Sequence, residues 1–211
     1  PLIGFSGSPW TLACYMLQGA GSREFAGARA WIYRAPDALQ RLLEIVAAAV
    51  ADYLRAQAAA GADALMIFDT WGGLLSADQY RRLSLSSMQN VLERLGGCRE
   101  SAEHPVMLFS KGCGDQLEAI AASGCAGVGV DWRLPLDVAR KRVQGRLALQ
   151  GNLDPVALCG PPESIRSETR RVLDEYGPHP GHIFNLGHGV TPDIDPEHVA
   201  AMVETVQGYR Y

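Results

Sequence analysis

Hydrophobic residues in this chain recur in six short runs that are separated by longer amphipathic segments. The runs are Leu2–Phe5, Ala64–Phe68, Val106–Phe109, Gly127–Val130, Leu147–Leu149 and His182–Leu186. Their apolar positions do not alternate strictly with polar ones, which is typical of strands covered on both faces. The six runs therefore predict a parallel sheet in which strands alternate with helices.

The segments between the runs carry helical patterns. The longest begins at Pro36 and repeats apolar residues at three- and four-residue spacing until Gly61 ends it. A second helix is expected from about Ser76 to Gly96-Gly97, and Ser8-Pro9 predicts a helix start after the first strand. Shorter helices are expected over Gln116–Ala122, Leu136–Val143, Glu163–Tyr176 and Glu197–Gln207, and a solvated loop over Gly96–Pro105.

Six consecutive strand–helix units without a break favour a barrel over an open sheet. A (β/α)₈ barrel, the TIM-barrel form of the α/β class, needs eight such units. The chain also opens within an element and has no initiator methionine. We therefore expect residues 1–211 to form one barrel domain that lacks an N-terminal segment and about two βα units.

Composition narrows the possible functions. The 211 residues are 47% hydrophobic and 20% charged, which is ordinary for a soluble globular domain, and the net charge of −4 argues against nucleic-acid binding. No apolar run reaches membrane-spanning length. The odd number of cysteines and the absence of a Cys-x-x-Cys pair indicate free thiols in a reducing cytoplasm. These cysteines are Cys14, Cys98, Cys113, Cys125 and Cys159.

A polar, glycine-rich loop follows every predicted strand. In a parallel barrel all such loops gather at one face, where active sites are built. Turn chemistry explains any single loop, but six together, with Trp71, Trp132 and His188 among their residues, favour a site. The loops are residues 5–9, 68–73, 109–114, 130–133, 150–155 and 185–189.

Histidine and tyrosine positions suggest particular roles at that face. His188 lies between two glycines just past the last strand, where an imidazole can donate to a carboxylate or relay a proton. Tyr15 lies about one helical turn past the first corner, and its spacing fits a pocket residue and a core residue equally well. The other histidines are predicted to be surface or structural residues: His104, His179, His182 and His198.

Two ligand-binding alternatives receive little support. Cys113, Asp131 and His188 each follow a strand, but no local ligand pair indicates a metal site. The segment that begins at Gly4 lacks the lysine of a phosphate-binding P-loop, and no Gly-x-Gly-x-x-Gly follows a strand. We therefore expect no metal.

Five motifs in this order resemble the uroporphyrinogen decarboxylase family, and they cover almost the whole chain. They are Gly4-Phe-Ser-Gly-Ser-Pro-Trp-Thr-Leu, Phe68-Asp-Thr-Trp-Gly-Gly, Gly129-Val-Asp-Trp, Leu149-Gln-Gly-Asn-Leu-Asp-Pro and Asn185-Leu-Gly-His-Gly. The resemblance implies a (β/α)₈ barrel, usually a homodimer. It also implies an enzyme that decarboxylates the four acetate arms of uroporphyrinogen III to give coproporphyrinogen III, with no metal or organic cofactor.

The resemblance also implies residue roles. Tyr15, Thr70 and His188 match substrate contacts of the family, and Phe5 matches an apolar wall of its pocket. The family's main catalytic aspartate and its carboxylate-binding arginine loop are expected before Pro1, so no catalytic residue is assigned within this chain. Cys113 stands where the family usually has glycine, a departure that we expect to be tolerated.

Two rival functions stay open at this point. A corrinoid or thiol methyltransferase of related fold would hold zinc through His-x-Cys, but the corresponding segment, Phe109-Ser-Lys-Gly-Cys, has no histidine. A non-catalytic tetrapyrrole-binding module would lack the aspartate and the arginines, and neither group falls within these residues.

Overall fold

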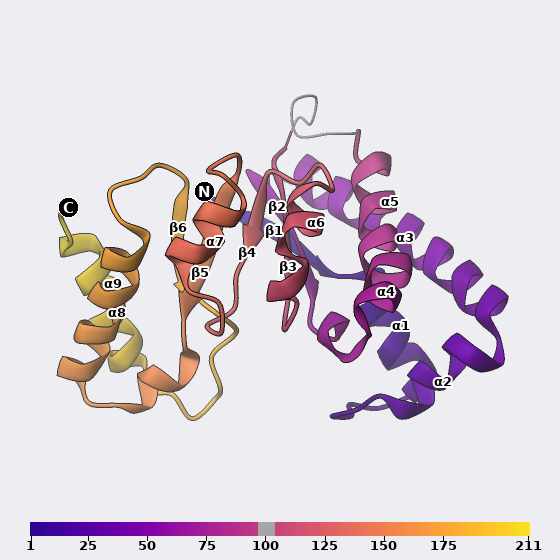
Figure 1. Ribbon diagram of the computed structural model, residues 1–211, viewed down its shortest axis with the longest axis horizontal. Helices are drawn as coiled ribbons and strands as arrows, with labels where there is room; N and C mark the ends of the chain where they lie inside the picture. The colour runs from indigo at the N-terminus through magenta and orange to yellow at the C-terminus, as the bar shows by residue number, and fades with distance from the viewer. Residues whose placement is uncertain (97–103) are drawn as a thin grey trace. The chain divides into compact units, whose positions relative to one another are not determined.

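The computed structural model describes residues 1–96 and 104–211. The chain divides into two units, residues 1–127 and residues 128–211. Both units have parallel strands that neighbour one another in chain order, with helices between them (Figure 1). The fold is therefore of the α/β class, as the hydrophobic runs predict. The expected loop over Gly96–Pro105 lies largely outside the described residues.

The first unit is built on three strands, and each is joined to the next by helices. Its elements are β1 (Ile3–Gly7), α1 (Pro9–Gln18), α2 (Ala26–Arg34), α3 (Pro36–Ala59), β2 (Ala64–Asp69), α4 (Ala77–Gln79), α5 (Ser86–Arg94), β3 (Val106–Ser110) and α6 (Leu117–Ala121). The register pairs Phe5 with Met66 and Phe68 with Phe109. This register brings the carboxyl ends of β1, β2 and β3 to one edge.

The amphipathic pattern from Pro36 forms the long helix α3, which packs against α1 and α5. Its apolar stripe reaches a core cluster that is centred on the fully buried Trp10 and Phe25. Gly61, at φ +105°, adopts a backbone conformation that favours glycine, and the chain turns there into β2. Burying an aromatic side chain such as that of Trp10 or Phe25 stabilises the fold by about 3 kcal/mol, which is the upper end of the usual range for one side chain.

The second helical pattern begins and ends where the sequence predicts, but its middle differs. Ser76 caps the start in a capping box with Gln79, and Gly96 follows the end at φ +118°. Between them, Tyr80–Leu85 form one π-helical turn. The apolar spacing predicts one continuous α-helix, because an inserted π turn barely alters that spacing.

The second unit repeats the alternation. Its elements are β4 (Gly127–Gly129), α7 (Leu136–Arg142), β5 (Ala148–Leu153), α8 (Pro162–Tyr176), β6 (His182–Leu186) and α9 (Pro196–Gly208), with β4 beginning at the last residue of the first unit. Short 3₁₀ turns complete the two units at Gly72–Leu74, Gly114–Gln116 and Pro155–Cys159. Helix α8 packs on α9, and α7 packs on β5.

Strand β5 is longer than the run Leu147–Leu149 predicts. It continues through Gln150, Gly151 and Asn152 because each of these residues pairs with a residue of β6. Asn152 is buried, and its amide donates to the carbonyls of Asp131 at 2.9 Å and Leu134 at 2.7 Å. Polar residues therefore continue this strand where the sequence predicts a loop. Helix α2 was also not predicted.

Candidate functional site

The corner between β1 and α1 is closed by Ser8, as the sequence predicts. The Ser8 hydroxyl accepts the Thr11 backbone N–H at 3.0 Å, and Pro9 occupies the first turn. The Ser8 backbone N–H donates to the carbonyl of Phe68 in β2 at 2.8 Å. The start of α1 is thereby attached to the end of the neighbouring strand.

Asp69, the last residue of β2, is completely buried at this edge. Its Oδ1 accepts the hydroxyls of Ser8 at 2.7 Å and Thr11 at 3.1 Å. Its Oδ2 accepts the hydroxyls of Ser84 at 2.7 Å and Ser110 at 3.3 Å. Burial raises the pKa of the carboxyl, and the four hydroxyl donors act in the opposite direction.

Tyr80 extends this hydrogen-bonded group into the π turn. Its hydroxyl lies 2.7 Å from Ser110 Oγ, and the ring is almost fully buried. Burial first, and the charge of Asp69 second, raise the pKa of the phenol. Tyr80 is therefore a neutral donor or acceptor near neutrality.

The residues directly after Asp69 carry one predicted substrate contact. Thr70 is half-buried at the strand end. Trp71 follows, and its backbone N–H donates to Thr11 Oγ1 at 3.4 Å while its carbonyl accepts the Trp10 indole N–H at 3.2 Å. Two residues of α1 thus hold the backbone next to Thr70.

Tyr15 lies on the same side of α1 as Thr11, one turn later. Its ring makes edge contacts with Phe25 at 5.4 Å and with Trp71 at 6.3 Å between ring centroids. The side chain is 42% exposed, so the phenol is not a core residue. The spacing of Tyr15 fits a pocket residue and a core residue equally well, and this exposure favours the pocket residue.

Phe5 lies on an apolar face of the three strands. Its ring meets Phe68 edge-on at 5.7 Å, and Phe68 in turn meets Phe109 at 5.9 Å. Phe109 and Phe68 continue into a cluster with Met66 and Met107. Phe5 itself is 60% exposed, so the first unit presents an open aromatic face.

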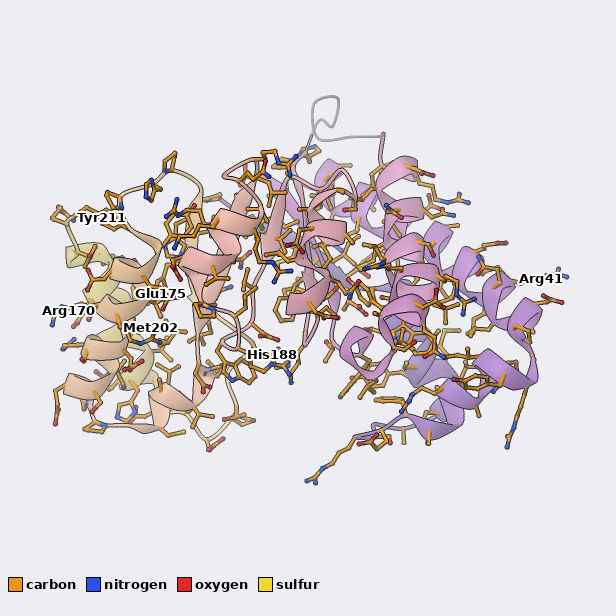
Figure 2. All side chains as sticks on the ribbon, viewed as in Figure 1. Arg41, Arg170, Glu175, His188, Met202 and Tyr211 are labelled. Atoms are coloured by element: carbon orange, nitrogen blue, oxygen red, sulfur yellow. The ribbon has the colours of Figure 1, made fainter. Side chains whose placement is uncertain are left out.

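His188 belongs to the second unit, on the loop after β6 (Figure 2). The preceding Gly187 donates its N–H to Leu153 at 2.7 Å, and a Cβ there would lie 2.6 Å from the backbone N of Trp132. Only glycine fits this close approach. The half-buried His188 is thereby held beside the ends of β4 and β5. Tyr15, Thr70 and Phe5 belong to the first unit.

The groups considered for a metal site have other partners. Asp131 is buried and accepts two side-chain hydrogen bonds from Arg133, at 2.6 and 3.2 Å. The Cys113 thiol lies 3.7 Å from the Lys111 carbonyl. In residues 1–96 and 104–211, no three His, Cys, Asp or Glu side chains form a group that could hold a metal ion.

Two histidines have the structural role that the sequence predicts. His182 Nε2 lies 2.9 Å from the Gly151 carbonyl, and its ring stacks on Tyr176 at 4.4 Å. Burial lowers the pKa of His182. His198 Nδ1 lies 2.6 Å from the Leu158 carbonyl.

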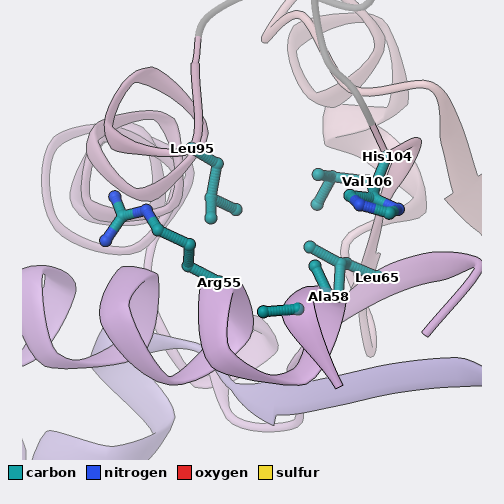
Figure 3. A pocket seen from close by; sticks show the side chains of 7 residues that line it. Arg55, Ala58, Leu65, Leu95, His104 and Val106 are labelled. Atoms are coloured by element: carbon teal, nitrogen blue, oxygen red, sulfur yellow. The ribbon is translucent and has the colours of Figure 1, made fainter. Parts of the chain in front are cut away.

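His104 lines a cavity of about 520 Å³ together with Arg55 and Leu95 (Figure 3). The cavity also contacts Leu65 and Val106, which lie at the amino ends of β2 and β3. It is therefore at the opposite edge of the strands from Asp69 and Thr70. Parallel α/β proteins bind their substrates at the carboxyl ends of the strands.

Asp69 is the residue at this edge that sequence reasoning missed. A carboxylate at the end of an otherwise apolar strand was the available signal, together with Ser8 and Thr11 in the preceding motif. Ser84 and Ser110 gave no signal, because their approach depends on the π turn and on the register of β3.

Comparison with known proteins identifies the family. The model of the uroporphyrinogen decarboxylase (URO-D) family matches residues 1–209. The chain belongs to this family. It is 55% identical over 206 residues to the uroporphyrinogen decarboxylase of Burkholderia pseudomallei strain 1106a and 54% identical to that of Alkalilimnicola ehrlichii. These matches cover 98% of the chain but only 57% and 56% of the relatives, so the chain spans little more than half their length.

Solved structures agree on the fold. A methyltransferase from Methanosarcina mazei superposes with a TM-score of 0.81 at 24% identity, covering 98% of this chain and 58% of that one. A putative vitamin-B12-independent methionine synthase from Listeria monocytogenes gives 0.60 at 11% identity, covering 99% of this chain and 64% of that one. At these identities the likeness shows the fold alone. With the family's TIM-barrel architecture, it confirms the predicted fold class.

Within residues 1–96 and 104–211, none of the helices combines the length and the apolar composition that a membrane-spanning segment needs.

Proposed function

We propose that the protein to which this chain belongs is a uroporphyrinogen decarboxylase that converts uroporphyrinogen III to coproporphyrinogen III without a cofactor. The observation that carries the proposal is the match of residues 1–209 to the family, with relatives of that name at 55% identity. The reaction removes carbon dioxide from four acetate arms. Protonation of a pyrrole carbon creates an electron sink, and the acetate loses carbon dioxide into it. A second proton completes the methyl group, and the ring carbon then releases the first proton to restore the pyrrole.

In this proposal the chain supplies substrate contacts and no proton donor. The Tyr15 and Thr70 hydroxyls hold a carboxylate or a pyrrole edge, and Phe5 offers an apolar wall. His188 meets a substrate carboxylate. Neither a threonine hydroxyl nor a phenol is well matched to acid catalysis near neutrality. The catalytic aspartate and the arginine loop belong to residues before Pro1.

We further propose that the complete barrel domain is a cytoplasmic homodimer. The cysteine pattern supports a reducing compartment, because the sequence has an odd number of cysteines and no Cys-x-x-Cys pair. Burial raises the pKa of Cys14 to about 12, so this thiol is unreactive near neutrality.

The proposal is tested with residues 1–211 joined to their natural N-terminal residues. Uroporphyrinogen III is supplied under anaerobic reducing conditions, and the products are oxidised and separated by chromatography. We expect the stepwise appearance of seven-, six-, five- and four-carboxyl porphyrins, unchanged by a chelator. Tight binding without any carboxyl loss would instead indicate a tetrapyrrole-binding module. Activity that is lost together with stoichiometric zinc would favour a methyltransferase-like enzyme.

A further inference from the structure

The carboxylate of Asp69 is buried among hydroxyls. The groups that donate to it are the side chains of Ser8, Thr11, Ser84 and Ser110. A buried carboxylate is costly unless hydrogen bonds satisfy it, so the loss of any of these donors is unfavourable. The carboxylate therefore holds together the segments that supply the donors. Three different segments meet at this one side chain.

The two carboxylate oxygens bind different parts of the first unit. Oδ1 accepts only from the first turn of α1, through Ser8 and Thr11. Oδ2 accepts from the π turn through Ser84 and from the end of β3 through Ser110. The attachment of α1 can therefore be weakened separately from the attachment of the π turn.

The α1 side of this group leads directly to the substrate contacts. Thr11 and Tyr15 are four residues apart and share one face of α1. Thr11 Oγ1 donates to Asp69 and accepts the backbone N–H of Trp71, while the Tyr15 ring meets the Trp71 ring. Thr70 lies between Asp69 and Trp71, so this linkage fixes the backbone on both sides of Thr70.

We propose that Asp69 is a positioning residue, whose Oδ1 holds α1 against the end of β2 and so sets Tyr15 relative to Thr70 for the substrate. This inference rests on the proposed function, because it assigns Tyr15 and Thr70 to the same substrate. Asp69 itself is fully buried, so it acts through Thr11 and Ser8.

The experiment compares two variants that each remove one hydroxyl donor from the same carboxylate. Thr11→Val removes one of the two donors to Oδ1, together with the acceptor of the Trp71 N–H, at nearly constant shape. Ser84→Ala removes one of the two donors to Oδ2. Both are made in the protein with its N-terminal residues and assayed with uroporphyrinogen III well below both melting temperatures. We expect kcat/KM to fall about tenfold in Thr11→Val and to stay within twofold in Ser84→Ala. Thr11→Ser, which keeps the hydroxyl, restores activity.

Equal losses of kcat/KM in Thr11→Val and Ser84→Ala would show that Asp69 supports the fold without positioning α1, and would overturn the inference. Unchanged activity in both would overturn it as well, while turnover by the unmodified protein would leave the proposed function intact. Absence of turnover in the unmodified protein would refute the proposed function instead. If Thr11→Val does not fold, Ser8→Ala takes its place, with the same outcomes.

Discussion

An alanine at Gly72 would disturb the buried group around Asp69 directly. Gly72 begins the 3₁₀ turn after Trp71, and its φ does not itself require glycine. A Cβ built there overlaps Asp69 Oδ2 and comes within 2.9 Å of Tyr80 Cε2. Gly72→Ala must therefore push the carboxylate away from its two donors on that side.

The size of the effect follows from those two donors. Ser84 at 2.7 Å and Ser110 at 3.3 Å both donate to the displaced oxygen. A hydrogen bond to a charged group contributes about 1.5 to 3 kcal/mol, so losing two lowers the free energy of unfolding by about 3 to 6 kcal/mol. This is a large share of the roughly 5 to 15 kcal/mol that stabilises a typical domain.

Urea unfolding followed by tryptophan fluorescence measures this loss. Gly21→Ala is the matched control, because a Cβ at Gly21 meets nothing within 4 Å, and we expect it to change stability by about 0.5 kcal/mol or less. In a Ser84→Ala background, Gly72→Ala should cost about 1.5 to 3 kcal/mol less than alone, because one of the two bonds is already gone. A Gly72→Ala protein whose free energy of unfolding lies within about 1 kcal/mol of the unmodified value would show that the carboxylate keeps both donors.

Three further predictions follow from the two units. Burial lowers the pKa of His182 from 6.5, so the unfolded chain binds more protons and stability falls as pH drops through that value. His182→Phe should therefore make the urea midpoint depend less on pH between pH 7.5 and 5.5. An unchanged pH dependence would contradict a lowered pKa of His182. Tyr15→Phe should lower kcat/KM modestly and leave the shape of the pH–rate profile unchanged, whereas loss of one limb would make Tyr15 a catalytic acid. His188→Ala should lower kcat/KM by roughly tenfold to a hundredfold, the effect of losing a charge-assisted contact. His104→Ala and His179→Ala should change kcat/KM little. Equal losses at all three positions would show that His188 does not line the substrate pocket.

The sequence predicts the elements whose signal is local. The stripe from Pro36 and the caps at Ser8 and Ser76 depend on neighbouring residues only, and the structure has them where they are predicted. The six apolar runs likewise predict the strands, apart from their polar ends, of which that of β5 is the longest. There the pairing with β6 decides the structure, and pairing is not local.

The candidate site is predictable only in part, for the same reason. His188 was predicted because a glycine-rich loop follows its strand, and Thr70 was predicted from the resemblance to the family. Asp69 was not, because its importance comes from four hydroxyls up to 61 positions away in the chain. The π turn that brings Ser84 to Asp69 also has no clear signature in the spacing of apolar residues.

A chimera tests directly whether residues 1–211 can serve as part of a uroporphyrinogen decarboxylase. The segment of the Burkholderia pseudomallei relative that matches this chain is replaced by residues 1–211, and the decarboxylation of uroporphyrinogen III is measured. We expect coproporphyrinogen III from the chimera, and no turnover by residues 1–211 alone, because these residues contribute contacts and no proton donor. A folded, substrate-binding chimera that releases no carbon dioxide would overturn the proposed function, as would turnover by residues 1–211 alone.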